Sequence, residues 1–165
     1  MSRRFHLQLG VALLAAAALV MLPSNGNAFG LSGAGGKLGY TSPEDLDGTT
    51  MIGGHVELEE NGTRFHLVPN LMYWKVDRVS DLNPNLDVYY HFRPEGKPSP
   101  YLGGGVGLNR SHSEATDRSE TNVGANVIGG MRFPARSNNY FVEGRYTASQ
   151  VSQVAVLGGI TFRTP

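Results

Sequence analysis

Short stretches of alternating apolar and polar residues follow one another along most of this chain, separated by turn residues. Strict alternation is typical of a β-strand with one apolar and one polar face, because successive side chains point to opposite sides. The stretch 121–133 is a clear case, since Val123 and Val127 alternate with Asn122 and Asn126. The pattern predicts strands over 30–41, 50–59, 64–76, 84–94, 99–110, 121–133, 139–148 and 152–163.

The second and third predicted strands allow a check on the register. Asn61-Gly62 is the preferred sequence for a two-residue type I′ turn, and this turn pairs Leu58 with Phe65. The pairing collects apolar residues on one face, and a shift of one residue would mix the two faces. Pro69 lacks the N–H group that a strand ladder uses, so we expect a local bulge there.

An even number of antiparallel strands, each with one apolar face, can close into a barrel without a free edge. The predicted fold class is therefore all-β, an eight-stranded antiparallel up-and-down β-barrel. A soluble ligand-binding barrel has its apolar face inside, whereas a transmembrane barrel has it outside. Alternation alone does not distinguish the two.

Aromatic residues on the apolar face favour the membrane alternative, because they gather at the ends of the predicted strands. Aromatic girdles at the two lipid–water interfaces are typical of transmembrane barrels. The girdle at the end nearer the chain termini is expected to contain Phe65, Phe92, Phe133, Tyr140 and Phe162. The girdle at the opposite end is expected to contain Tyr73 and Tyr146.

The other face carries charges of both signs, which can pair inside a barrel. An eight-stranded barrel is just wide enough for side chains to fill it, so a lumen of paired charges leaves no open channel. The predicted polar network of the lumen contains Glu57, His66, Asp87, His91, Arg132, Glu143 and Arg145. Outer loops are expected around 42–49, 77–85, 110–120 and 147–152.

The N-terminus has the features of a secretory signal peptide. Two arginines precede an apolar run from Leu9 to Leu22, and small residues lead up to a cleavage site after Ala28. The run is shorter than a membrane-spanning helix requires, although an uncleaved anchor is the alternative. We therefore expect a signal peptide over 1–28 and one β-barrel domain over 29–165.

Composition limits the possible partners and cofactors. Without the predicted signal peptide, 12 Lys and Arg stand against 14 Asp and Glu, and no basic stripe indicates a nucleic-acid partner. The chain has no cysteine, so an exported domain would have to be stable without disulfides.

Two glycine-rich stretches resemble nucleotide-binding motifs but lack the required context. In FGLSGAGGKLGY (29–40), a phosphate loop ending at Gly36-Lys37 would need glycine in place of Leu31. GGGVG (103–107) lacks the helix that follows a dinucleotide fingerprint. We interpret both stretches as strands that bend and pack closely, with no cofactor, although alternation alone leaves the facing of Lys37 open.

Histidines suggest a metal site as a further hypothesis. His55, His66 and His91 are predicted to face the lumen on neighbouring strands, which makes a metal site conceivable. The predicted position of Glu57 across from His66 favours an internal hydrogen bond instead, and no metal site is expected.

Four motifs, taken in order, resemble the small OmpA/OmpX-like outer-membrane β-barrels of Gram-negative bacteria. PYLGGGVGLN (100–109) is similar to the fifth strand of such proteins, and DVYYHFRPEGKPSPYLGGGVG (87–107) includes the strand and turn before it. GGMRFPARSNNYFVEGRYT (129–147) is similar to their hairpin of strands six and seven. VAVLGGITF (154–162) resembles their C-terminal signal, although Arg163-Thr164-Pro165 follow the final aromatic residue.

The resemblance implies an outer-membrane location, contact with lipid, recognition of strand 154–162 by the barrel-assembly machinery, and surface or host partners bound through outer loops. Our leading hypothesis is a non-catalytic outer-membrane protein with a structural or surface-interaction role. A soluble periplasmic barrel that binds an apolar ligand is the first alternative.

The second alternative is an enzyme, because some eight-stranded barrels of this kind modify lipid A with serine and histidine near the outer rim. A serine nucleophile needs a base within hydrogen-bond reach and a third group that orients the base. The candidates crowd one predicted loop without a strand-anchored partner, so catalysis is not expected. These candidates are Ser111, His112, Ser113, Glu114 and Asp117.

Overall fold

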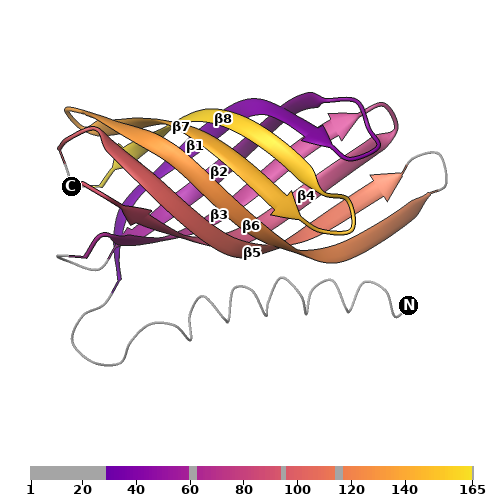
Figure 1. Cartoon of the computed structure of the whole chain (residues 1–165), viewed down its shortest axis with the longest axis horizontal. Coiled ribbons are helices and arrows are strands. Elements are labelled where there is room, and N and C mark those ends of the chain that lie inside the picture. Colours follow the sequence, from indigo (N-terminus) through magenta and orange to yellow (C-terminus); the bar gives the residue numbers. More distant parts are fainter. Residues whose placement is uncertain (1–28, 60–62, 94–95, 114–116, 165) are drawn as a thin grey trace.

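The computed structural model describes residues 29–59, 63–93, 96–113 and 117–164, which form a closed barrel of eight antiparallel strands (Figure 1). Each strand pairs with the next in the chain, and the last pairs with the first. The predicted fold class is thus confirmed. The strands are β1 (Gly30–Pro43), β2 (Thr49–Glu59), β3 (Phe65–Val76), β4 (Val79–His91), β5 (Ser99–Ser113), β6 (Arg118–Ala135), β7 (Asn138–Ala148) and β8 (Gln153–Arg163).

Two predictions fall outside the residues that the structure describes. These are the signal peptide over 1–28 and the Asn61-Gly62 turn. Within the described ranges, the structure contains no helix with the length and apolar character needed to cross a membrane.

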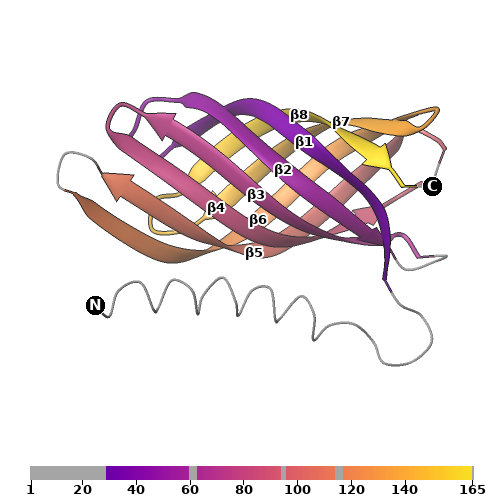
Figure 2. The ribbon, with the colours of Figure 1, turned by 180° about the vertical axis from the view of Figure 1, so that it is seen from behind.

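The two ends of the barrel carry different connections. At one end, called here the terminal end, β1 begins and β8 ends (Figures 1 and 2). The connections β2–β3, β4–β5 and β6–β7 also lie there. The opposite end, called the far end, carries the connections β1–β2, β3–β4, β5–β6 and β7–β8.

The predicted outer loop over 77–85 is wrong. Val76 pairs with Val79, so β3 and β4 are joined by the turn residues Asp77 and Arg78 alone. The following residues, SDLNPN, resemble a loop in composition, but their Asp and Asn side chains point into the barrel and are buried. Asp and Asn are common in turns, but they also suit the polar interior of a barrel strand. The composition of SDLNPN was therefore a misleading indicator of a loop.

The predicted loop over 110–120 is also mostly strand. β5 continues to Ser113 and β6 begins at Arg118, with the two strands paired to their ends. The β6–β7 ladder ends at the pair Ala125–Ala148. The β5–β6 hairpin therefore extends beyond β7 at the far end, and residues 118–124 of β6 are paired with β5 only.

The register predicted for β2 and β3 is wrong by two residues. Leu58 pairs with Leu67 rather than with Phe65. The predicted faces are nevertheless kept, because side chains alternate with a period of two. The pairs His55–Asn70 and Leu58–Leu67, on either side of Pro69, share one register, so the expected bulge is not there.

A bulge does occur in β1, and it settles the facing of Lys37. The register of β1 against β2 shifts between Leu31 and Gly33. Leu31 is consequently 53% exposed on the outside, whereas Lys37 points into the barrel and is 4% exposed.

Apolar side chains cover the outside of the barrel, while the inside is filled with polar residues and two apolar clusters. The outer set includes Leu38, Ile52, Leu71, Val88, Leu102, Val106, Val142 and Val156, all at least 40% exposed. The inner cluster nearer the far end contains Met51, Met72, Trp74, Ala155 and Leu157. The other inner cluster contains Val68, Tyr89, Tyr101, Ile128 and Phe141.

Inward-facing glycines make room for these lumen side chains. A Cβ atom at Gly105 would overlap the Asp87 carboxylate and the Leu86 carbonyl oxygen. At the adjacent Gly104, which points outward, the nearest atom to such a Cβ is the carbonyl oxygen of Asn126, at 3.4 Å.

The two glycines therefore form a matched pair for mutation. We expect Gly105→Val to lower the free energy of unfolding by about 1–3 kcal/mol through overpacking. Gly104→Val should change it by no more than about 0.5 kcal/mol, as is usual for outward positions. Urea titration of the barrel in detergent, followed by Trp74 fluorescence, measures both. Equal effects at the two positions would contradict this account of the inner glycine.

Candidate functional site

The centre of the lumen is organised around the carboxylate of Glu143 on β7. Lys37 Nζ on β1 lies 3.2 Å from Glu143 Oε1, and Arg145 Nη2 lies 3.2 Å from the same oxygen. The hydroxyl groups of Tyr89 and Tyr101 donate to Glu143 Oε2 at 3.0 and 3.1 Å. One buried carboxylate thus joins side chains from β1, β4, β5 and β7.

A second buried carboxylate, Asp87 on β4, extends this network. Arg145 Nη2 lies 2.7 Å from Asp87 Oδ2. The amide groups of Asn70 and Asn126 donate to Asp87 at 2.7 and 3.0 Å. Lys37 and Arg145 therefore balance the charges of Glu143 and Asp87. Asn85 and Thr147 bond to the asparagines of the same network.

A separate ion pair lies closer to the terminal end. Arg132 Nη2 on β6 donates to Glu57 Oε2 on β2 at 2.9 Å. Thr161 Oγ1 donates to Glu57 Oε1 at 3.0 Å and lies 2.9 Å from His55 Nε2. Since the Thr161 hydroxyl hydrogen is directed at Glu57, His55 Nε2 acts as the donor to Thr161.

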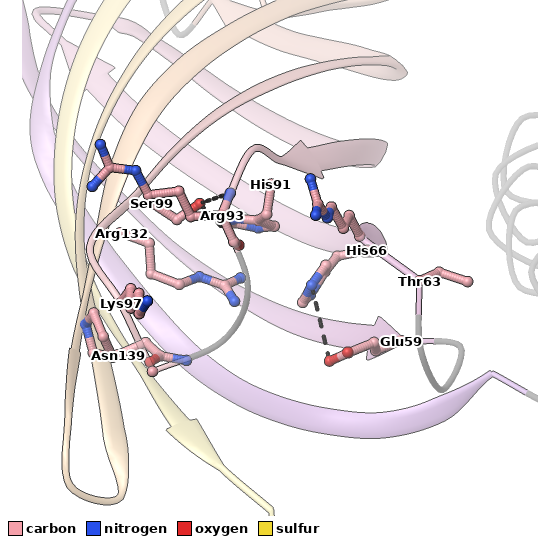
Figure 3. A pocket seen from close by; sticks show the side chains of 12 residues that line it. Glu59, Thr63, His66, His91, Arg93, Lys97, Ser99, Arg132 and Asn139 are labelled. Atoms are coloured by element: carbon pink, nitrogen blue, oxygen red, sulfur yellow. Dashed lines mark hydrogen bonds and ion pairs between the residues drawn. The ribbon is translucent and has the colours of Figure 1, made fainter.

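A small basic pocket lies at the terminal end, and Arg132 of this ion pair is part of its lining (Figure 3). His66 Nε2 lies 3.9 Å from Glu59 Oε2 in the pocket, and the ring of His66 meets the ring of His91 at 4.5 Å between centroids. The cavity holds about 30 Å³, which is room for very few water molecules. Its further lining includes Arg64, Arg93, Lys97, Ser99, Arg132 and Asn139.

The lumen between these groups is closed. Glu143 and Val68, near its middle, are 1% and 0% exposed. The enclosed space beside Lys37, Glu57 and Arg132 measures about 10 Å³, which is close to the smallest space that holds one water molecule. At these two places, both formed by described residues, the lumen is too tightly filled for an organic ligand or for a continuous water path.

The histidines of the lumen do not form a metal centre of the usual kind. Within the described part of the chain, no three His, Cys, Asp or Glu side chains are arranged to hold a metal ion. His55 instead contacts the edge of Phe141, and His91 packs against His66 and Tyr101.

The structure brings together the residues predicted for the lumen in two groups. Asp87, Glu143 and Arg145 share the central network, and Glu57, Arg132, His66 and His91 lie toward the terminal end; all seven are at most 8% exposed. Sequence reasoning missed the central members Lys37, Tyr89, Tyr101, Asn70, Asn85 and Asn126. These residues alternate with outward-facing ones along their strands, and this alternation is the sequence signal that could have placed them in the lumen.

The seven predicted girdle residues all lie on the outside, between 40% and 56% exposed. They are Phe65, Tyr73, Phe92, Phe133, Tyr140, Tyr146 and Phe162. Tyr40 adds a further outward aromatic side chain, 58% exposed, near the far end of β1.

Comparison with solved structures finds a similar fold in several bacterial proteins. Neisserial surface protein A (NspA) matches with a TM-score of 0.61 at 14% identity, over 80% of this chain and 95% of that chain. The N-terminal β-barrel domain of Pseudomonas aeruginosa OprF matches with a TM-score of 0.62 at 16% identity, over 82% and 99%. Ail, the attachment invasion locus protein of Yersinia pestis, matches with a TM-score of 0.55 at 14% identity, over 81% and 97%.

The chain has the fold of the small outer-membrane β-barrels. The resemblance inferred from the four sequence motifs is thus confirmed at the level of the fold. No family model matches the sequence, and no curated protein matches it either.

The residues that depart from the outer-membrane barrel pattern at the C-terminus extend the seam between β8 and β1. Arg163 is still part of β8, and Thr164 N donates to Ser32 O at 3.0 Å. Thr164 Oγ1 donates to Leu31 O. Arg163 and Thr164 therefore bond to the bulged start of β1.

The serine and histidine candidates for catalysis do not converge. Ser111 points inward and donates to Asp81 Oδ2 at 3.3 Å. His112 points outward, and its Nδ1 lies 3.0 Å from Ser119 Oγ. Among the residues described by the structure, no carboxylate bonds to His112, while Glu114 lies outside them.

Removal of the central carboxylate tests how far this outer-membrane-type barrel depends on its lumen network. We expect Glu143→Gln to lower the free energy of unfolding by about 3–5 kcal/mol, because Lys37 is left buried without its counter-charge. Adding Lys37→Met should recover part of that loss. The exposed Glu44→Gln is the control, with an expected change within about 0.5 kcal/mol.

Urea titration in detergent measures all four proteins. A Glu143→Gln variant as stable as Glu44→Gln, or a double variant less stable than Glu143→Gln, would contradict the assigned role of Glu143.

Proposed function

We propose that this protein is a non-catalytic outer-membrane β-barrel with a sealed lumen, which acts in surface interaction or envelope structure through its far end. The observation that carries the proposal is the apolar outer wall bounded by aromatic residues. Soluble monomers rarely expose a contiguous apolar patch of more than a few hundred Å². Here apolar side chains face outward on every strand, so lipid is the environment that fits them.

The aromatic residues support the same orientation. Phe65, Phe92, Phe133, Tyr140 and Phe162 lie toward the terminal end, while Tyr40, Tyr73 and Tyr146 lie toward the far end. Aromatic side chains prefer the two interfaces of a bilayer. Connection length does not distinguish the two ends, since the β3–β4 turn at the far end has only two residues. The orientation instead follows from placing both chain termini on the periplasmic side, so the far end, where the β5–β6 hairpin extends beyond β7, would face the outside of the cell.

The alternative of a soluble barrel with an apolar ligand does not fit the interior. Its ligand site would have to lie in the lumen, where three acids pair with three bases. Among the described residues, the two spaces next to these groups hold about 30 and 10 Å³, far below the roughly 300 Å³ or more of ordinary ligand pockets. A larger hollow of about 810 Å³ lies against the outward-facing side chains of Ile52, Leu71 and Leu82, on the outer wall and not in the lumen.

The surface role rests on the β5–β6 hairpin. Its outer part extends beyond β7 and leaves one edge of β6 without a strand partner over 118–124. An exposed strand edge offers backbone groups to a partner. NspA is named as a surface protein, and Ail has been solved in complex with the heparin analogue sucrose octasulfate, with a TM-score of 0.51.

Export and assembly complete the proposal. Residues 1–28 would act as the signal peptide, so that N-terminal sequencing of the protein from outer membranes should begin at Phe29. The strand 154–162 would be read by the barrel-assembly machinery, since Val154, Val156 and Phe162 present its apolar outer face.

Arginine substitutions on the outer wall distinguish a lipid-facing surface from a water-facing one. Val142 lies on β7 between Tyr140 and Tyr146, so Val142→Arg should cost about 2–4 kcal/mol if this surface is within the bilayer. Val123→Arg on the extended hairpin should cost no more than about 1 kcal/mol. Stability is measured by urea titration in lipid vesicles, and assembly by heat-modifiable gel mobility of the outer-membrane fraction.

In a soluble barrel both positions face water, and both substitutions would be tolerated. Equal stability of the two variants, or recovery of the wild-type protein from the periplasm without detergent, would overturn the membrane proposal.

A lipid-A-modifying enzyme is the second candidate function, and the contact between His112 and Ser119 on the outer surface is the observation that favours it. The non-catalytic proposal predicts that lipid A keeps its acyl chains whether or not the protein is expressed. Mass spectrometry of lipid A checks this. A changed acyl number that His112→Ala or Ser119→Ala abolishes would instead establish the enzyme.

A further inference from the structure

Several buried polar atoms at the far end of the lumen have no hydrogen-bond partner among the described residues. These are Asp81 Oδ1, both amide atoms of Asn83 and of Asn109, and the indole Nε1 of Trp74. Asp81, Asn83 and Asn109 are only 4%, 2% and 4% exposed. Buried polar groups are nearly always satisfied, and each exception calls for an explanation such as a bound ion or water.

The unsatisfied groups belong to two adjacent rows of inward-facing side chains. In the upper row, Asp81 on β4 pairs with Ser111 on β5, and Ser111 pairs with Glu120 on β6. Ser111 Oγ donates to Asp81 Oδ2 at 3.3 Å. Since directly opposed side chains of antiparallel strands lie within about 5.5 Å at Cβ, the two carboxylates flank one hydroxyl group.

The lower row consists of three asparagines. Asn109 on β5 pairs with Asn122 on β6. Asn83 on β4 lies at the level of Asn109, because the neighbouring pairs Leu82–Arg110 and Asn85–Gly107 share one register. The two rows together present two carboxylates, three amide carbonyls and one hydroxyl on a single wall.

The two carboxylates of this wall have no counter-charge among the residues that the structure describes. Within the described residues neither Asp81 nor Glu120 forms an ion pair, whereas Lys37, Arg132 and Arg145 are engaged with other acids deeper in the lumen. Arg110, the neighbour of Ser111, belongs to the opposite, outward face of β5. The basic residue nearest in register is Arg118, one row closer to the rim and exposed.

Access to the wall is possible from the far mouth of the barrel. Glu120 is exposed and Ser111 and Asn122 are half-buried, while Asp81 and the other two asparagines lie deeper. Trp74 pairs with Asp81, and Met72 pairs with Asn83, so apolar side chains adjoin the polar wall on the β3 side. A charged ligand can therefore enter from outside and lose part of its water on reaching Asp81.

We propose that these two rows bind a divalent cation of the calcium type at the outer mouth of the barrel. Carboxylate, amide and hydroxyl oxygens are the donors that Ca²⁺ takes, in sets of six to eight and with flexible geometry. Bound there, the ion would tie β4 and β5 to the extended part of β6. This inference does not depend on the proposed surface role.

The single tryptophan of the chain supplies a direct assay. Trp74 lies opposite Asp81, so Tb³⁺ bound between the two rows should emit when the indole is excited. The experiment uses the full barrel, purified in a zwitterionic detergent without lipopolysaccharide. We expect sensitised Tb³⁺ emission that Ca²⁺ displaces with a Kd of about 10⁻⁴–10⁻³ M, the range of sites with few carboxylates.

Two variants and one matched control test the assignment. Asp81→Asn and Glu120→Gln should each weaken Ca²⁺ binding by about 10-fold or more. Asp77→Asn, in the adjacent β3–β4 turn, removes one charge at the same end of the barrel and should leave binding unchanged; at its positive φ of 50° asparagine is well tolerated. Heat-modifiable gel mobility verifies that each variant is folded.

Ca²⁺ should also raise the urea midpoint of the wild type, and less so that of Glu120→Gln, because a ligand that binds only the folded state stabilises it. Glu120 is exposed, so its variant keeps the test valid if Asp81→Asn fails to fold. Absence of Ca²⁺-displaceable emission would show that water alone satisfies these groups. If Glu120→Gln and Asp77→Asn bound Ca²⁺ with equal affinity, the binding would be explained by non-specific surface charge. Each of these two results would overturn the proposal.

Discussion

The network of ion pairs and hydrogen bonds around Glu143 is the interaction on which the rest of the barrel depends. A carboxylate in a lumen this narrow is stable only if its charge is matched and its oxygens are bonded. Arg145 meets this requirement from the same strand, while Lys37, Tyr89 and Tyr101 meet it from strands that are distant in sequence. The network thereby links opposite walls across the lumen, and it fills the space that a pore would need.

Because the lumen is filled, the two ends and the outer wall are the parts of the barrel that remain available for contacts with other molecules. The terminal end is closed by the Glu57–Arg132 pair beneath a small basic pocket. At the far end, the apolar cluster around Trp74 adjoins acids and amides that form no ion pair with any residue that the structure describes. Unsatisfied groups next to an extended hairpin make the far end the part of the molecule with capacity left for a ligand or partner.

Sequence reasoning was right where apolar and polar residues alternate strictly, because that pattern predicts only a strand. It was wrong where residues common in turns also suit the polar face of a strand. The register predicted for β2 and β3 was wrong by two residues, because it was inferred from the dipeptide Asn61-Gly62 alone, whereas the observed pairs follow another register. The composition of SDLNPN predicts a loop, because Asp, Asn and Pro are common in turns. In this barrel the Asp and Asn side chains belong to the polar face of β4, and Pro84 points outward.

The sequence by itself determined the number of strands, their order, and which residues share a face, because a period of two is a local property of the chain. It also identified most acids and bases of the lumen, with the exceptions of Lys37 and Asp81, since they alternate with the outward apolar residues. Only the tertiary structure decided which partners meet. The bulge at the start of β1 turns Lys37 inward, and closure of the sheet brings it to Glu143, 106 residues away along the chain. Such contacts depend on the stagger of all eight strands together, which no single stretch of sequence encodes.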